Sequence, residues 1–347
     1  MIELKLALLG FGHVAQAFTK LLAQKITSFD QYNVDLKIVG VATASHGIAT
    51  NPVGIDSTRL IEAYQAGQSL EKFHTDNRIA NPLEFINRVD ADILVETITL
   101  NPNTGQPAVD YVKTALQGGL HVITTNKSTP AFAHSYLSQL ARQHNRAFLF
   151  EGTVLDGTPV FSLVRDTLPA TEILGFTGVV NSTTNFILTA MEEGLPPEDA
   201  LRQAQALGIA EKNADYDLDG WDAAAKAAIL INALLGGKIT PTDITRTGIK
   251  HLTTRTVIEA ARQGRRFKLL AEARWRDGNI IARVTPRMLP LNNPLAHVNG
   301  SSAALTLVTD TLGEITIHLN EGEVPQTAYA LLSDLMTVIK THYAQQT

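Results

Sequence analysis

The feature that most constrains the fold is a glycine-containing turn near the N-terminus. An apolar run of strand length, Leu4–Leu9, leads directly into Gly10-Phe11-Gly12-His13-Val14-Ala15, and an amphipathic helix follows. This is a G-x-G-x-x-A fingerprint between a strand and a helix, the context in which dinucleotides bind. Gly10 permits the tight turn, Gly12 lets a pyrophosphate approach the helix N-terminus, and Ala15 keeps the helix close to the sheet. We therefore predict a nucleotide-binding α/β domain.

The rest of the first 150 residues continues the alternation of strand and helix that is typical of a doubly wound sheet. Strand patterns lie at Asp35–Ala42, Asp92–Thr97, His121–Thr124 and Ala147–Phe150. Helical patterns lie at Pro107–Leu116 and Pro130–Asn145, and residues 48 to 90 read as polar and mostly helical. Thr97 and the loop after it, and Thr125-Asn126-Lys127, follow strands at the edge where such sheets bind ligands. Lys127 is either solvated or directed to the glycine turn.

The end of the second strand bears on the choice of coenzyme. It runs into Ala42-Thr43-Ala44-Ser45-His46-Gly47, without the carboxylate that would hold the ribose hydroxyls of NAD. Ser45 or His46 can donate to a 2′-phosphate, although His46 is equally well a plain loop residue. NADP is therefore permitted, and NAD is not excluded.

A second stretch, Leu207–Ile229, carries residues suited to proton transfer. Its first half is turn-prone and holds Glu211, Asp215, Asp217 and Asp219. Its second half is an alanine-rich helix in which Asp222 and Lys226 share one face. Most such pairs are exposed and worth roughly a few tenths of a kcal/mol, yet this run is apolar nearly all round, which predicts a buried helix. A lysine with little water around it suits proton transfer, and the nearby carboxylates suit a substrate with an ammonium group.

The sequence changes in character at Glu151, where a turn-rich junction begins. Strand patterns follow at Glu172–Val180, Lys268–Trp275, Ile280–Pro286 and Ala303–Leu319. Helical patterns lie at Phe186–Glu193 and Pro197–Leu207 and, at the end, at Pro325–Tyr343, and residues 238 to 266 read as helical and polar. Asn181-Ser182-Thr183-Thr184-Asn185 is either an N-cap cluster or a carboxylate site at a helix N-terminus.

Composition narrows the class of protein. A chain of 347 residues, 44% hydrophobic and 18% charged, is typical of a globular protein of two domains. The net charge of −5 gives no reason to expect nucleic acid or an anionic membrane as partner. The absence of cysteine excludes disulfides, thiolate zinc sites and a cysteine nucleophile. With no apolar run near the ~20 residues of a membrane span and no signal peptide, we expect a cytoplasmic enzyme.

Taken together, these segments resemble homoserine dehydrogenases over nearly the whole chain. The matching blocks are the glycine turn, T-N-K at 125–127, G-V-V-N-S-T-T-N-F-I-L at 178–188 and G-I-A-E-K-N-A-D-Y-D-L-D-G-W-D-A-A-A-K at 208–226. The resemblance implies a Rossmann-type dinucleotide-binding domain at 1–150, completed by 318–347. It also implies an α+β catalytic and dimerisation domain with a mixed sheet at 151–317, in a homodimer. The chain is too short for an added ACT domain or a fused aspartate kinase.

The resemblance further implies roles for individual residues. Lys226 would be the acid–base lysine with Asp222 as its partner, and Lys127 would contact the substrate beside the nicotinamide. Glu211, Asp217 and Thr183 would bind homoserine. NADP or NAD would contact Gly10–Ala15, Thr43, Ser45, Thr97, Asn126 and Lys127. A cation such as Na⁺ would bind at the domain junction to Glu151, Val154, Asp156 and Thr158, some through backbone carbonyls; a structural turn without an ion explains these four equally well.

Three departures from the family pattern bear on activity. Ser182 replaces a usual glycine, Asn213 replaces a common aspartate, and Glu321 and Glu323 occupy a region that is usually a glycine-rich coenzyme loop. Acidic residues near a cofactor phosphate would weaken its binding. Two alternatives therefore stay open: another amino-acid dehydrogenase, for example one acting on aspartate, and a nucleotide-sensing protein without turnover. Aspartate-semialdehyde dehydrogenase is excluded because it needs a thiol.

Overall fold

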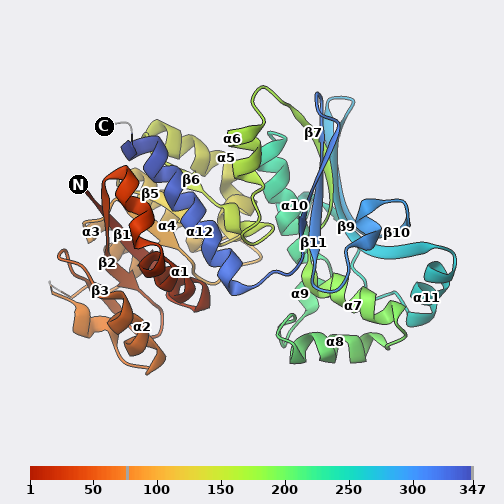
Figure 1. Cartoon of the computed structure of the whole chain (residues 1–347), viewed down its shortest axis with the longest axis horizontal. Coiled ribbons are helices and arrows are strands. Elements are labelled where there is room, and N and C mark those ends of the chain that lie inside the picture. Colours follow the sequence, from red (N-terminus) through yellow and green to blue (C-terminus); the bar gives the residue numbers. More distant parts are fainter. Residues whose placement is uncertain (76–77, 345–347) are drawn as a thin grey trace. The chain divides into compact units, whose positions relative to one another are not determined.

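The computed structural model describes residues 1–75 and 78–344 and divides into two compact units (Figure 1). The first comprises Met1–Gly157 and Glu323–Thr347, and the second comprises Thr158–Gly322. Among the described residues, every helix is too short or too polar to span a lipid bilayer.

The first unit is built on the predicted doubly wound sheet. Its strands are β1 (Ile2–Leu9), β2 (Val34–Ala42), β3 (Ile48–Thr50), β4 (Ile93–Glu96), β5 (His121–Thr124) and β6 (Phe148–Leu149), in the order β3-β2-β1-β4-β5-β6. All neighbours run parallel except β3, which is antiparallel to β2. Because the chain passes from β1 to β2 on one side and to β4 on the other, β1 and β4 flank the point where a doubly wound sheet binds ligands.

Helices cover this sheet and join its strands. They are α1 (His13–Gln24), α2 (Ser57–Gln65), α3 (Pro82–Arg88), α4 (Ala108–Gln117) and α5 (Ser128–Gln143), with 3-10 turns η1 (Ile26–Tyr32), η2 (Leu70–Phe73) and η3 (Glu151–Thr153). The expectation that residues 48–90 are mostly helical was wrong at its start. Gly47, at φ +88, turns the chain back along β2, and β3 is too short to show an alternating pattern.

The C-terminal segment belongs to this unit as well. Helix α12 (Val324–Val338), blue in Figure 1, lies beside α1 and continues into the π-helix η6 (Ile339–Tyr343). Leu331, Leu335 and Val338 join the core formed by Leu4, Leu6 and Leu8 of β1 and by Phe18 of α1. Burying three aliphatic side chains contributes roughly 1.5–3 kcal/mol each before entropy is counted, which ties the last residues of the chain to the first.

The second unit holds a mixed sheet, as predicted. Its strands are β7 (Ile173–Val179), β8 (Thr245–Arg246), β9 (Arg265–Arg276), β10 (Asn279–Pro290), β11 (Ala303–Thr309) and β12 (Glu314–Leu319), in the order β12-β11-β7-β9-β10-β8. Only the β8–β10 pair is parallel among the described pairs. The single strand expected at 303–319 is two, because Thr309 and Gly313, at φ +72, close a turn between them.

The helices of this unit are α6 (Phe161–Thr167), α7 (Ser182–Glu192), α8 (Pro197–Ala206), α9 (Asp215–Leu218), α10 (Trp221–Leu234) and α11 (Thr254–Arg262). The 3-10 turns η4 (Pro241–Asp243) and η5 (Pro294–His297) accompany them. Residues 238–266 were expected to be helical, but only η4 and α11 are, and β8 lies between them. Helix α10 is buried nearly all round, as its alanine run predicted.

Candidate active site

The glycine turn after β1 is fixed by hydrogen bonds of the Gly10 backbone and is unobstructed at Gly12. Gly10 has φ +93, its N–H donates to the Ala42 carbonyl (2.9 Å), and its carbonyl accepts from the Thr97 hydroxyl (3.2 Å). A Cβ on Gly10 would lie 2.8 Å from the Thr97 carbonyl carbon, whereas a Cβ on Gly12 would meet nothing within 4 Å. The first turn of α1, His13 to Gln16, carries no acidic residue. An unobstructed helix N-terminus of this kind fits a pyrophosphate.

A buried carboxyl group, which the sequence reading did not single out, organises the neighbouring strand ends. Glu96 is 0% exposed and accepts from the Thr124 hydroxyl (2.7 Å), the Asn126 amide (3.1 Å) and the Ile98 N–H (2.9 Å). Burial raises its pKa to about 7, and the three hydrogen bonds oppose that rise. Glu96 thus ties the segment that contains Thr97 to the one that contains Asn126 and Lys127, and Lys127 lies just before α5.

The turn after β2 is compact. The Thr43 hydroxyl donates to the Gly47 carbonyl (3.0 Å) and accepts from the His46 N–H (2.9 Å), while the Ser45 hydroxyl lies 2.6 Å from Nδ1 of His46. The β2 end itself lacks an acid, but the structure brings one from η2: a Cβ on Gly47 would lie 3.0 Å from Cγ of Glu71. No local pattern links positions 47 and 71, so sequence reasoning missed this carboxylate.

In the second unit, Lys226 and Asp222 occupy one face of α10. Their side chains are 14% and 8% exposed, and the Lys226 Nζ lies 3.5 Å from Oδ2 of Asp222. The same amine donates to the Val180 carbonyl at the end of β7 (2.6 Å). The lysine is therefore largely shielded from solvent and held at a defined place by two oxygen atoms.

Asn181 and Asp217 complete this cluster. The Asn181 amide nitrogen donates to Oδ1 of Asp217 (2.7 Å) and to Oδ2 of Asp222 (3.0 Å). Thr183 is buried, and its hydroxyl donates to the Ile209 carbonyl (3.1 Å), which places the start of the acidic loop beside α7. Glu211 is exposed two residues further on. Two further carboxylates of this stretch, Asp215 in α9 and Asp219 just after it, accept from the Lys250 amine.

The four residues proposed for a cation include only two carboxylates, Glu151 and Asp156. Glu151 and Val154 are buried, the Glu151 N–H donates to Asp334 (2.9 Å), and Asp156 accepts from Thr327 (3.3 Å). Thr158 belongs to the other unit. Within residues 1–75 and 78–344, no three Asp, Glu or His side chains are grouped as a metal site. A cation here would depend on backbone carbonyls.

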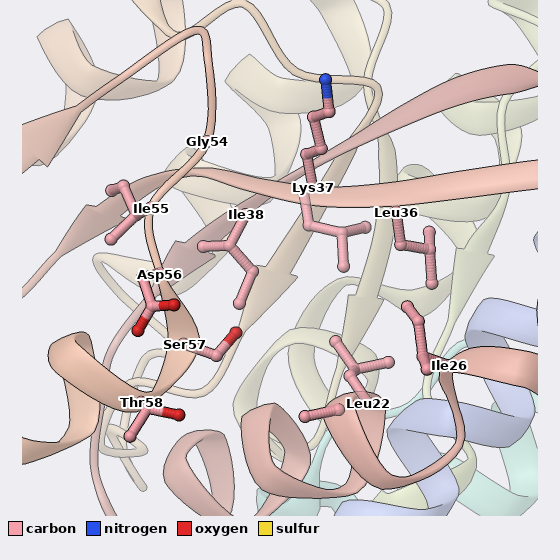
Figure 2. A pocket seen from close by; sticks show the side chains of 12 residues that line it. Leu22, Ile26, Leu36, Lys37, Ile38, Gly54, Ile55, Asp56, Ser57 and Thr58 are labelled. Carbon is pink, nitrogen blue, oxygen red and sulfur yellow. The ribbon is translucent and has the colours of Figure 1, made fainter.

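A cavity of about 470 Å³ lies between the end of α1, β2 and the start of α2 (Figure 2). Leu22, Ile26 and Leu36 form one wall, Asp56, Ser57 and Thr58 stand opposite, and the Lys37 amine points away from Leu22. None of the residues assigned to substrate or coenzyme lines it. It lies along the middle of β2 instead of at the carboxyl ends of the strands, so we do not assign it to the active site.

A dinucleotide turn on a Rossmann sheet, together with a shielded lysine–carboxylate pair, defines the class: a dinucleotide-dependent oxidoreductase. Residues 10–151 match the family "Homoserine dehydrogenase, NAD binding domain", and residues 159–336 match the family "Homoserine dehydrogenase". The chain belongs to the homoserine dehydrogenase family, whose members are NAD(P)-dependent oxidoreductases acting on a CH–OH group.

Full-length relatives support this membership. The chain is 38% identical to an NAD(+)-dependent homoserine dehydrogenase of Pseudomonas canavaninivorans, over 97% of both chains. It is 33% identical to a homoserine dehydrogenase of Methanocaldococcus jannaschii, over 95% of this chain and 97% of the relative. A solved structure of a putative homoserine dehydrogenase from Archaeoglobus fulgidus superposes with a TM-score of 0.86 at 32% identity, covering 97% of this chain and 99% of the other.

Proposed function

We propose that Lys226 is the acid–base residue that this chain uses to interconvert L-homoserine and L-aspartate 4-semialdehyde with NAD(P). The bound nicotinamide supplies the chemistry of accepting or returning the hydride carried by C4 of the substrate. The observation that carries the proposal is the shielded Lys226 amine, held by the Val180 carbonyl and Asp222. In oxidation the neutral amine takes the hydroxyl proton, and in reduction the ammonium group returns it.

The geometry of the amine supports this role. A protonated lysine has three N–H bonds; the Lys226 amine donates one to the Val180 carbonyl and forms an ion pair with Asp222 at 3.5 Å. A further N–H can then donate to a substrate oxygen. Proton transfer by a positioned side chain contributes about 10²–10⁴-fold to a rate, and holding the reactants in contact contributes the remainder.

The other roles follow from charge and position. We assign the substrate's amino and hydroxyl ends to Glu211 and Asp217, and the substrate region beside α7 to Thr183, because carboxylates pair well with an ammonium group. Lys127 is assigned to the substrate beside the nicotinamide. Gly10 to Ala15, Thr43, Ser45, Thr97 and Asn126 are assigned to the coenzyme. Residues 1–150 and 318–347 would then serve the coenzyme, and 151–317 the substrate.

The wider setting is part of the proposal. We propose a homodimer because a hollow of about 330 Å³ on the second sheet is lined in part by Thr177, the Glu272–Arg283 pair and Ile281, a residue that is 51% exposed. Light scattering, which measures the molecular mass in solution, tests whether the protein is a homodimer. A monovalent cation near Glu151 and a cytoplasmic location are proposed on the family resemblance.

The experiment that tests the function is a spectrophotometric assay of coenzyme reduction at about 340 nm, with homoserine and then with aspartate as substrate. Reduction with homoserine alone supports the proposal. Reduction with aspartate would favour another amino-acid dehydrogenase, and coenzyme binding without turnover on either substrate would favour a nucleotide sensor.

A further inference from the structure

One asparagine side chain joins both carboxylates of the proposed catalytic cluster. Asn181 is 5% exposed and immediately precedes α7. Its Oδ1 accepts from the Thr184 N–H (2.8 Å) and the Thr184 hydroxyl (2.7 Å). Its Nδ2 donates one hydrogen to Asp217 (2.7 Å) and the other to Asp222 (3.0 Å). Each amide atom thus has two partners of the right kind.

This bonding pattern fixes the orientation of the amide. If the amide were reversed, Oδ1 would face two carboxylate oxygens and Nδ2 would face the Thr184 N–H, and both arrangements are repulsive. The N-cap role explains the bonds at Oδ1, but it does not explain the bonds at Nδ2. A serine or threonine would serve as a cap equally well, and neither could donate to two carboxylates at once.

The bridge acts on the atoms around the lysine. The Asp222 oxygen that accepts from Asn181 is the oxygen that lies 3.5 Å from the Lys226 amine. The residue before Asn181, Val180, gives its carbonyl to the same amine. Asp217, which lies in α9, accepts the other N–H of the same amide. One short segment at the junction of β7 and α7 therefore contacts Lys226, Asp222 and Asp217.

We propose that Asn181 is a positioning residue. Its neutral amide holds Asp217, the carboxylate assigned to substrate binding, close to Asp222, the partner of Lys226, without adding charge. Two carboxylates drawn together would otherwise repel each other or take up a proton. This inference rests on the proposed roles of Lys226, Asp222 and Asp217.

Two substitutions separate this role from capping. Asn181→Ser keeps a cap acceptor and removes the bridge, so we expect kcat for homoserine oxidation to fall about 10- to 100-fold, the loss of a hydrogen bond to a charged group. Asn181→Asp keeps the cap and nearly the same shape but turns a carboxylate oxygen toward Asp217 and Asp222. We expect it to lower kcat further and to raise the pH of half-maximal oxidation by about one unit, because added negative charge retains protons.

The control is Asn293→Asp, which makes the same change at the cap of η5 in the same unit. It should leave kcat, KM and the pH profile unchanged. Coenzyme binding, followed by nicotinamide fluorescence, and the unfolding temperature show whether each variant is folded. The inference would be overturned if the Asn181 variants were folded, had kcat and KM within twofold of wild type, and showed no shift of the pH profile. Absence of homoserine turnover in the wild-type enzyme would instead overturn the proposed function.

Discussion

The Lys226 amine and Asp222 lie 3.5 Å apart on one turn of a helix whose other residues, apart from Asn232, are apolar. Their side chains are only 14% and 8% exposed, so this pair differs from the surface ion pairs elsewhere in the chain, such as Arg202 with Asp199, where the arginine is 74% exposed. Because water screens the pair weakly, each charge depends on the other. We therefore expect turnover to require both residues.

Replacing Asp222 by asparagine should lower kcat about 100-fold with little change in coenzyme affinity. Asparagine has nearly the same shape as aspartate but lacks the negative charge beside the Lys226 amine. A 100-fold loss of kcat lies within the range expected when proton transfer is disturbed. Steady-state kinetics with homoserine measure it, and Asp199→Asn, which removes an exposed carboxylate, serves as the control. A kcat within twofold of wild type would exclude Asp222 from the mechanism.

The two glycines of the nucleotide turn should respond differently to substitution. Gly12→Val should weaken NAD binding more than tenfold without lowering the unfolding temperature, because a Cβ there meets nothing within 4 Å and extends into the space that the pyrophosphate would need. Gly10→Ala should destabilise the protein by about 1–3 kcal/mol, since it places a Cβ at positive φ and against Thr97. Calorimetry of binding and thermal unfolding separate the two. Normal NAD affinity in Gly12→Val would contradict the assignment of this turn.

Glu71 should make NAD the preferred coenzyme. Its carboxylate lies against the turn that follows β2, where the adenosine ribose binds in Rossmann folds, and it would repel a 2′-phosphate. Glu71→Gln should therefore raise kcat/KM for NADP relative to NAD by about tenfold, which corresponds to ~1.4 kcal/mol. The control is Glu62→Gln, which makes the same change at an exposed position of α2. An unchanged ratio in Glu71→Gln would remove Glu71 from coenzyme selection.

Glu96 should make stability depend on pH. Its pKa is near 4.5 when unfolded and is raised by burial to about 7 in the fold. Between these values the folded state holds a proton that the unfolded state has released, so the free energy of unfolding falls as pH rises from 4.5 to 7. At ~1.4 kcal/mol per pKa unit, the fall is on the order of 3 kcal/mol. Denaturant titrations of wild type and Glu96→Gln should diverge in this window; parallel curves would argue against a protonated Glu96.

Much of the fold was predictable because its signals are local. The glycine turn sits between a strand and a helix, and the alanine run of α10 carries its own burial pattern. Short elements such as β3 and β8 were missed because three or two residues show no period. The functional contacts were harder to predict: Asn181 meets carboxylates 36 and 41 residues further along the chain. Its sequence context indicated a helix cap or a carboxylate site, and only the tertiary fold adds the bridge to Asp217 and Asp222.

The most direct test of the central claim is the turnover of Lys226→Ala with homoserine, measured beside its affinity for NAD. We predict a loss of at least 10²-fold in kcat with NAD affinity within about twofold of wild type. The control Lys238→Ala, which alters an exposed lysine just beyond the same helix, should behave as wild type. Near-normal turnover of a folded Lys226→Ala enzyme would contradict the account.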